Sequence, residues 1–424
     1  MSDTVSDHVP EYPELMTRDL PAGVRLVEGG VTAANGFRAG NTACGIKSDA
    51  GLPDLAMLVA DGVCAAAGTF TTSKTASHTV LLDREKLSST GGHAQAVVVN
   101  SGNANCSNGE QGMLDARRMS ELAAQKLGVD PSLVLVSSTG IIGRRLPMEK
   151  VEQGIAQIEV NPSGGPDFAQ GIITTDTRTK TIAVEFTIEG KTVRLGGSTK
   201  GAGMIYPNMA TMLCYITTDA AAEPAYLQQM LSGAVDDSFN MVCVDGDMST
   251  NDTVLLFASG VAGNTPLNAS SPDAALFESA LRHVTRYLAR EISRDGEGAS
   301  RFQTVTVRHA PTRDDARKAA RAITNSPIWQ CAMAGSDPNW GRVIAALGKS
   351  GANLDHNKLD IALGGILVVS QGIAAEYDQA AAKAAMGQAE VAVDVDLHLG
   401  DETAMAWGCD LTHGYIDENA TYTR

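Results

Sequence analysis

KGAGMIYPNMATMLCYITTDA, residues 200–220, places Thr211 directly before an apolar run, MLCYIT, that is expected to form a buried strand. A threonine hydroxyl is a weak nucleophile near neutral pH and needs an adjacent base. If the Ala210–Thr211 peptide bond is cleaved, the new α-amino group of Thr211 can be that base, because its pKa is about 7.7 to 8.0. The stretch therefore predicts a threonine nucleophile held at the start of a strand.

The residues before this bond suit such a site. Gly201 and Gly203 allow the backbone to bend and approach a ligand closely, and Pro207 stiffens the approach to Ala210. An Ala-Thr step before an apolar strand is nevertheless ordinary in proteins. The stretch taken alone therefore leaves a purely structural role open.

Strand and helix patterns alternate along the rest of the chain. Apolar residues at helical spacing predict helices over residues 113–127, 224–239, 271–292 and 313–324. Alternating apolar residues predict a hairpin over TIAVEFTIEGKTVRLGG, residues 181–197, that turns at Glu189-Gly190, and a strand over VAVDVDLHLG. The run AQAVVVNSGNANC indicates a buried strand that ends in a small polar loop over 100–105.

A second candidate feature is the Thr139-Gly140 turn, which follows the strand expected over SLVLVSS. A threonine hydroxyl and a glycine N–H presented together can bind the negative oxygen of a tetrahedral intermediate, and one such donor contributes roughly 3 to 4 kcal/mol. A plain turn remains open from the sequence pattern alone.

Charge and composition exclude several classes of function. The chain has 424 residues and a net charge of −16, from 33 basic and 49 acidic residues, so most of its surface repels nucleic acid and anionic membranes. Residues 1–20 are expected to be a flexible N-terminal extension, and their polar, acidic start is not that of a secretory signal. We therefore expect a cytoplasmic enzyme.

The cysteine and histidine patterns predict no protein-built metal site. Seven scattered cysteines form no CxxC pair and are expected to be buried thiols, and no HExxH motif occurs. Asp245, Asp247 and Asp252 lack the spacing of a calcium-binding loop, so a hydrogen-bonded structural loop is expected there. The GKT and GKS triplets lack the preceding glycine of a phosphate loop.

Distinctive segments recur along almost the whole chain; in chain order they are GFRAGNTACGIK, GTFTT, NSGNANC, SSTGIIGRRLP, TTDT, KGAGMIYPNMATML, DGDMSTNDT, RDGEGA, DPNWGR and HGYIDENATYT. This series resembles the landmarks of the ornithine acetyltransferase family, also called the bifunctional glutamate N-acetyltransferase family of arginine biosynthesis. An ordered series of this kind is far more specific than any one segment.

The resemblance implies a DmpA/ArgJ-like layered α/β fold, in which helices cover the sheets. It further implies a precursor that cleaves itself between Ala210 and Thr211. The products would be an α chain, residues 21–210 after the extension, and a β chain, residues 211–424. The two chains would stay associated, as α2β2 or a larger assembly.

The resemblance also assigns roles to residues. Thr211 would be the nucleophile and its own base, and Thr139 with Gly140 would form the oxyanion hole. The substrate-binding residues would be Thr177, Lys200, Thr211, Glu297, Asn419 and Thr423. Without the resemblance, Lys200 could be a solvated lysine and Glu297 a loop acid, and Asp295 is a second choice for the acidic substrate contact.

The activity that the resemblance implies is transfer of the acetyl group of N-acetylornithine to glutamate through an acetyl-Thr211 ester. No metal or bound cofactor is expected, and acetyl-CoA stays open as a co-substrate. An N-terminal-threonine amidase or aminopeptidase, an acyltransferase of a specialised pathway and an uncut binding homologue are the alternatives. The departures from the family pattern that leave the exact donor and acceptor open are Ala202, Tyr206, Gln330 and Arg424.

Overall fold

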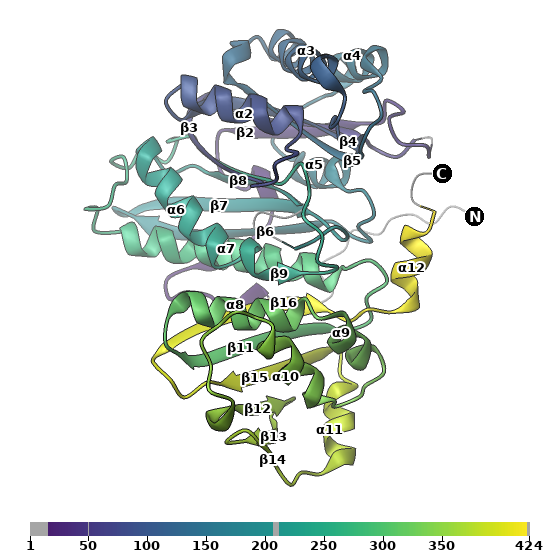
Figure 1. Ribbon diagram of the computed structural model, residues 1–424. Helices are drawn as coiled ribbons and strands as arrows, with labels where there is room; N and C mark the ends of the chain where they lie inside the picture. Colours follow the sequence, from purple (N-terminus) through teal and green to yellow (C-terminus); the bar gives the residue numbers. More distant parts are fainter. Residues whose placement is uncertain (1–15, 50, 207–211, 422–424) are drawn as a thin grey trace.

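The computed structural model describes residues 16–49, 51–206 and 212–421. Within these residues the chain forms two β-sheets with helices on their faces (Figure 1). The layered α/β architecture expected from the sequence is therefore confirmed.

The larger sheet has nine strands and contains most of the first half of the chain. Its order is β1-β6-β7-β8-β10-β3-β4-β5, and β2 pairs with β3. The strands are β1 (Arg25–Val27), β2 (Phe37–Thr42), β3 (Leu55–Phe70), β4 (His93–Asn103), β5 (Val134–Ile141), β6 (Lys180–Ile188), β7 (Lys191–Lys200), β8 (Leu213–Thr218) and β10 (Thr253–Ala258). Two neighbouring pairs, β4 with β5 and β8 with β10, are parallel.

The smaller sheet has seven strands in the order β14-β13-β12-β15-β11-β16-β9. They are β9 (Val242–Cys243), β11 (Phe302–Ala310), β12 (Asp360–Leu363), β13 (Ile366–Ser370), β14 (Ile373–Ala374), β15 (Glu390–Asp396) and β16 (Glu402–Cys409). The pairs β11–β15 and β16–β9 are parallel, and β12 runs antiparallel to β15. Segments far apart in sequence therefore meet at the ends of these strands.

The helices form layers above, between and beside the sheets, as Figure 1 shows. They are α2 (His78–Ser89), α3 (Gly109–Leu127), α4 (Met148–Gln157), α5 (Gly165–Ile172), α6 (Pro224–Asp236), α7 (Ala274–Arg294), α8 (Arg313–Thr324), α9 (Pro327–Ala334), α10 (Trp340–Gly348), α11 (Gln379–Met386) and α12 (His413–Asn419). Short 3₁₀ helices cover Gly30–Thr32, Pro131–Leu133, Phe239–Met241 and His356–Lys358. Helix α7 contacts β6 and β7 of the larger sheet as well as β16 of the smaller one.

The strand after the predicted cleavage point lies in the centre of the larger sheet and is buried on both faces. In β8, Leu213 and Tyr215 join an apolar cluster that includes Phe168 of α5. The alternate residues Cys214 and Ile216 join a second cluster with α6 and α7. Because successive side chains of a strand point to opposite faces, the apolar run of β8 fits a strand covered on both sides.

The predicted hairpin forms as β6 and β7, paired from Lys180↔Thr199 to Ile188↔Lys191. Glu189 and Gly190 at its turn both have positive φ, 50° and 73°. This pair of left-handed residues is typical of a tight hairpin turn.

Several predicted boundaries are wrong by a few residues. Helix α3 begins at Gly109 instead of 113, and α6 ends at Asp236 instead of 239. Two further differences have a visible cause. Helix α7 begins at Ala274 because the hydroxyl of Ser271 instead accepts a hydrogen bond of 3.0 Å from the Asn268 N–H, which closes a turn. The loop expected over 100–105 begins late, because β4 continues to Asn103 through parallel pairing with β5.

The described part of the expected N-terminal extension packs against the fold. The carbonyl oxygen of Met16 lies 2.9 Å from Nε2 of His283 on α7, and Asp19 pairs with Arg290 at 3.3 Å. Arg18 pairs with Glu390 of β15 at 3.1 Å. Residues 16–19 therefore contact both α7 and the smaller sheet.

All seven cysteines are free thiols, and five of them are buried. Cys44 is half-buried and Cys331 is exposed. In the described parts of the chain, no helix has the length and apolar character needed to cross a membrane.

Candidate active site

One pocket brings together most of the candidate residues from both halves of the chain. Thr139 and Gly140 come from the end of β5, Lys200 from the end of β7, Glu297 from the loop after α7, and Asn419 from the end of α12. The complete lining is Ala104, Thr139, Gly140, Ile142, Thr174, Thr175, Lys200, Gly203, Met204, Ser249, Thr250, Asn251, Glu297 and Asn419.

The Thr139-Gly140 pair is shaped by the parallel pairing of β4 and β5. Gly140 lies opposite Gly102 and has a φ of 129°, a conformation that favours glycine. A Cβ atom at Gly140 would lie 2.3 Å from the carbonyl carbon of Gly102. Only glycine therefore fits at this point of the pocket wall.

Asn251 fastens this strand end to the loop after β9, and it is not among the residues predicted from the sequence. Its buried amide Nδ2 donates to the carbonyl oxygens of Ser138, at 2.8 Å, and Ala104, at 2.7 Å. The side chain thus links the loop after β9 to the ends of the neighbouring strands β4 and β5, next to Thr139. The polar DGDMSTNDT segment was the available signal, but the sequence does not show which of its residues reaches β5.

Lys200 is buried and directs its charge at Thr139. Its Nζ atom donates a hydrogen bond of 3.3 Å to the hydroxyl oxygen of Thr139. Burial lowers the pKa of Lys200, an effect that nearby Asp176 opposes and nearby Lys180 reinforces. Since Lys200 acts as the donor, the hydroxyl hydrogen of Thr139 is available to a further acceptor.

A buried ionic cluster underlies the pocket. Nζ of Lys180 lies 2.5 Å from both Asp176 Oδ1 and Asp295 Oδ2, and the Lys180 side chain is fully buried. Asp176 also accepts a hydrogen bond of 2.7 Å from the Gly201 N–H, next to Lys200. Burial alone would raise the pKa of Asp176, but Lys180 and Lys200 hold it well below its ordinary value.

Thr177 does not line the pocket. Its N–H donates to Asp295 Oδ2 at 3.1 Å and its hydroxyl donates to Asp295 Oδ1, so the residue belongs to the ionic cluster. Thr174 and Thr175 of the same TTDT segment line the pocket instead. Asp295, the second choice for an acidic substrate contact, also belongs to this ionic cluster, where it contacts Lys180 and Thr177.

Glu297 and Asn419 form the acidic side of the pocket. Nδ2 of Asn419 donates to Glu297 Oε2 at 2.7 Å, and the Glu297 N–H donates to the Ala202 carbonyl oxygen at 2.9 Å. A Cβ atom at Gly203 would lie 2.2 Å from Glu297 Oε2. The glycine at 203 is therefore needed for the close approach of this carboxylate.

The described residues on either side of residues 207–211 donate backbone hydrogen bonds to two aspartates. Asp245 accepts a hydrogen bond of 2.8 Å from the Ile205 N–H, and Tyr415 donates its hydroxyl to the same carboxylate at 3.2 Å. Asp252 is buried and accepts a bond of 3.2 Å from the Met212 N–H. Burial raises the pKa of Asp252 well above its ordinary value.

Several residues singled out from the sequence lie outside the part of the chain that the structure describes, so their positions relative to the pocket are not given. They are Ala210, Thr211 and Thr423, together with the departure Arg424.

The remaining departures from the family pattern lie around the pocket or away from it. Gln330 is buried, its amide donates to the carbonyl oxygens of Val244 and Cys409, and it is not among the residues that line the pocket. Ala202 contributes its backbone carbonyl to the Glu297 loop, and the guanidinium of Arg321 lies 4.6 Å from the ring centre of Tyr206.

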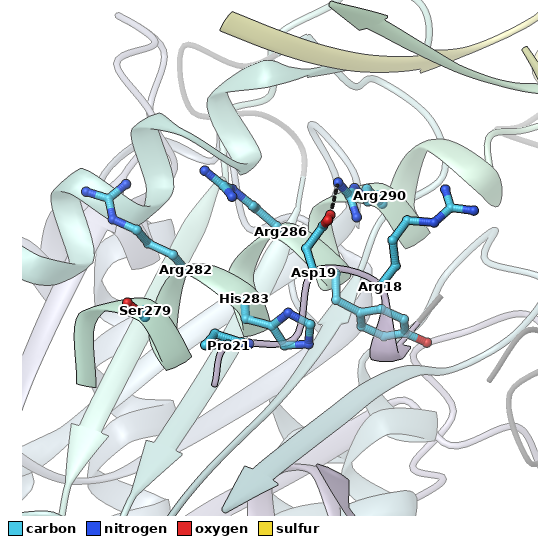
Figure 2. A pocket seen from close by; sticks show the side chains of 9 residues that line it. Arg18, Asp19, Pro21, Ser279, Arg282, His283, Arg286 and Arg290 are labelled. Atoms are coloured by element: carbon cyan, nitrogen blue, oxygen red, sulfur yellow. Dashed lines mark hydrogen bonds and ion pairs between the residues drawn. The ribbon is translucent and has the colours of Figure 1, made fainter. Parts of the chain in front are cut away.

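A second pocket lies between the N-terminal segment and α7 (Figure 2). Arg282, Arg286 and Arg290 project from successive turns of the helix, and Asp19 contacts Arg290. Arg282 also pairs with Asp237. Acidic partners thus neutralise much of this basic surface, and its lining includes none of the candidate residues predicted from the sequence.

Comparison with known proteins gives a consistent result along the chain. The model of the ArgJ family matches residues 38–424. The "Arginine biosynthesis bifunctional protein ArgJ" of Symbiobacterium thermophilum is 48% identical over 397 residues, which cover 93% of this chain and 98% of the relative. The protein of the same name from Thermotoga neapolitana is 45% identical over 392 residues, covering 91% of this chain and 98% of the relative.

Solved structures give partial matches. The arginine biosynthesis bifunctional protein of Bacillus halodurans is 40% identical and covers 48% of this chain and 96% of its own, with a TM-score of 0.47. An ornithine acetyltransferase from Mycobacterium tuberculosis, solved with ornithine, is 36% identical and covers 43% of this chain and 98% of its own, with a TM-score of 0.39.

Proposed function

This chain belongs to the ArgJ family, and from that premise we propose that it transfers an acetyl group from N-acetylornithine to glutamate in arginine biosynthesis. The observation that carries the proposal is the pocket in which Thr139, Gly140, Lys200, Glu297 and Asn419 meet. It combines hydrogen-bond donors suited to an oxyanion with one basic and one acidic group suited to an amino acid.

The first half of the proposed reaction forms an ester. After cleavage of the Ala210–Thr211 bond, the Thr211 hydroxyl attacks the acetyl carbonyl carbon and gives its proton to the Thr211 amine. The Thr139 hydroxyl and the Gly140 N–H donate to the oxygen that becomes negative. Collapse of this intermediate breaks the amide bond, and the leaving amine of ornithine takes the proton from the Thr211 ammonium.

The second half of the reaction regenerates the enzyme. The amine of glutamate attacks the ester carbonyl carbon, and the same donors stabilise the second oxyanion. The attacking nitrogen gives one proton to the Thr211 amine, the ester bond breaks, the Thr211 oxygen takes that proton from the Thr211 ammonium, and N-acetylglutamate leaves. Each product departs before the next substrate reacts, so the proposed mechanism is ping-pong. The proposed transfer step uses no metal.

Charge in the pocket supports recognition of an amino acid. Lys200 can meet a substrate carboxylate, and Glu297, oriented by Asn419, can meet the side-chain ammonium of ornithine. Thr177 donates a hydrogen bond to Asp295 and thereby stabilises the buried ionic cluster next to the pocket. Thr423 stays proposed as a substrate contact from the extreme end of the chain.

The relatives are named bifunctional proteins, which favours acetyl-CoA as a second acetyl donor for glutamate. An assay with acetyl-CoA in place of N-acetylornithine distinguishes the bifunctional from the monofunctional enzyme. Release of free acetate without any acetylglutamate would instead indicate a hydrolase.

We also propose that the cleaved chains, residues 21–210 and 211–424, stay together as an α2β2 or larger cytoplasmic assembly. Both chains would contribute to the pocket, since Thr139 and Lys200 precede the cleavage point and Glu297 and Asn419 follow it. The intact chain mass under denaturing conditions and the native mass in solution test these two statements separately.

The decisive experiment replaces the nucleophile. Thr211→Ala should leave a single 44.2 kDa chain with no transfer activity, whereas the parent protein should give two fragments, the second beginning with TMLCYITT. Thr211→Ser, which keeps a hydroxyl, is the matched control and should retain cleavage. Cleavage or glutamate-dependent transfer at the parent rate in Thr211→Ala would overturn the proposal.

A further inference from the structure

A cluster of two histidines and two aspartates lies at one end of the smaller sheet, outside the active-site pocket. Parallel pairing of β11 with β15 sets Arg308 opposite Asp396, and antiparallel pairing of β12 with β15 sets Asp360 opposite the same Asp396. His309 follows Arg308, and His398 lies two residues beyond Asp396. Three separate segments thus bring their side chains to one point.

The side chains are arranged around the Asp396 carboxylate. Nδ1 of His309 lies 2.7 Å from Oδ2 of Asp396, and Nδ1 of His398 lies 3.3 Å from Oδ1. The two imidazole rings are nearly parallel, with 17° between their planes and 6.1 Å between their centres. One ligand atom from each of the three residues lies within 4.8 Å of the other two.

The backbone holds both histidines in an uncommon conformation. His309 has a φ of 52° and His398 a φ of 50°, both in the left-handed region. The N–H groups of Leu399 and Gly400 donate to the His309 carbonyl oxygen at 2.8 and 2.9 Å, so the two loops are joined directly. The backbones of both histidines are therefore held by hydrogen-bonded loops, while their side chains are exposed.

The contacts of His398 point to a positive charge between the ring and Asp396. Its Nε2 atom lies 2.9 Å from Oδ2 of Asp360, whose other oxygen accepts a bond of 2.7 Å from the Gln371 N–H. A neutral His398 that donates from Nε2 presents the lone pair of Nδ1 to a carboxylate oxygen of Asp396. Two acceptors then face each other at 3.3 Å, an arrangement that a proton or a metal ion relieves.

We propose that His309, Asp396 and His398 bind one divalent transition-metal ion of the Zn²⁺ type. Zn²⁺ takes histidine nitrogen at about 2.0 to 2.1 Å and carboxylate oxygen at about 2.0 to 2.2 Å, so its tetrahedral ligand atoms are roughly 3.3 Å apart. Small rotations of side chains that are 25 to 50% exposed bring the three ligand atoms to that spacing. Water completes the coordination.

Asp360 acts as the outer partner of this site. Histidine ligands in metal sites usually donate their second ring N–H to a carboxylate, which fixes the tautomer and the ring orientation. Asp360 makes this contact with His398. The carboxylates of Asp360 and Asp396 also bring negative charge to the site, which a divalent cation neutralises.

Zinc binding is tested on the full-length protein that carries Cys331→Ser, because this substitution removes an exposed thiol that could bind zinc. After treatment with EDTA and desalting, titration with ZnCl₂ alone should show one ion per chain. Replacing zinc by Co²⁺ should give the visible absorption of a nitrogen- and oxygen-coordinated ion. The absence of both signals would overturn the proposal without any variant in the cluster.

Variants then assign the ligands. The double variant His309→Asn/His398→Asn should weaken zinc binding at least about 100-fold, and Asp360→Asn should weaken it by about 10- to 100-fold. His356→Asn, at an exposed histidine outside the cluster, is the matched control and should bind like the parent. Undiminished binding in a folded double variant, judged by circular dichroism, would place the ion elsewhere and leave these residues as a hydrogen-bonded His–Asp cluster.

Discussion

The Nζ atom of Lys200 donates a hydrogen bond of 3.3 Å to the hydroxyl oxygen of Thr139, and both side chains are buried. A hydroxyl that accepts from a cationic donor becomes a stronger donor itself, because the two hydrogen bonds polarise each other. Lys200 thus supports the proposed oxyanion hole in addition to its proposed contact with a substrate carboxylate.

Removal of the Thr139 hydroxyl tests the oxyanion hole. Thr139→Val keeps the shape of the side chain but deletes the donor, so kcat should fall by about 10²- to 10³-fold while KM changes little. Steady-state acetyl transfer from N-acetylornithine to glutamate measures both constants. Thr139→Ser should retain most of the parent kcat; a Thr139→Val enzyme within about threefold of the parent would exclude the assigned role.

The charge of Glu297 tests substrate recognition. Glu297→Gln keeps an oxygen for Asn419 but removes the negative charge proposed to meet the ornithine ammonium. KM for N-acetylornithine should rise by about 10- to 100-fold, since a hydrogen bond to a charged group contributes about 1.5 to 3 kcal/mol.

Two comparisons make the Glu297 result specific. KM for glutamate should change less, because glutamate carries no side-chain ammonium. Glu418→Gln, at an exposed position beside Asn419, should leave both KM values unchanged. An equal rise in the two KM values would argue for general damage to the pocket.

Loss of Lys180 tests the buried ionic cluster. Lys180→Met leaves Asp176 and Asp295 buried without their shared cation, and the free energy of unfolding should fall by about 3 to 5 kcal/mol. Urea unfolding followed by circular dichroism measures the change. Lys318→Met, which breaks the exposed pair with Asp314, should leave the unfolding midpoint unchanged; similar losses in both variants would contradict this account.

Asp252 gives a prediction about pH. Its folded-state pKa is raised by burial above the unfolded value of 3.8, so the folded chain holds the proton more tightly. The stability that this group contributes is therefore complete below pH 3.8 and is lost as the pH rises toward the folded-state pKa. Asp252→Asn removes this titration and keeps an oxygen for the Met212 N–H.

The test compares urea unfolding of Thr211→Ala, the parent here, with that of Thr211→Ala/Asp252→Asn, at about pH 5 and about pH 7. Thr211→Ala is present in both because it should leave a single uncut chain. The stability of the double variant relative to its parent should increase with pH, by at most about 1.4 kcal/mol per pH unit. A difference that stays constant between the two pH values would show that Asp252 does not titrate above its ordinary range.

Local patterns in the sequence predicted the elements whose signal is local. The hairpin of β6 and β7 follows from alternation through Ile182, Val184, Phe186 and Ile188, all of them buried. The apolar stripe of α7 and the strand character of β8 were equally visible. The predicted start of α7 at Ser271 is wrong because the Ser271 hydroxyl accepts a hydrogen bond from the Asn268 N–H in a turn. This contact depends on a residue three positions earlier.

Contacts between distant segments could not be predicted in this way. The Asn251 amide bonds to Ser138 across 113 residues of sequence, and His309 meets Asp396 only because β11 and β15 pair in parallel. Periodicity does not specify which strands are neighbours or in which register. The expectation of no metal site rested on short sequence motifs, whereas the proposed zinc ligands come from separate segments that no short motif includes.

The strand order of the larger sheet gives the proposed cleavage an unusual outcome. Strands β8 and β10 lie between β7 and β3, and every one of these neighbours is hydrogen-bonded. Cutting between residues 210 and 211 would therefore assign β7 and β3 to one polypeptide and the two strands between them to the other. The products would be interleaved parts of a single sheet, which neither fragment could complete by itself. The backbone hydrogen bonds between β7 and β8 and between β10 and β3 would then hold the two fragments together.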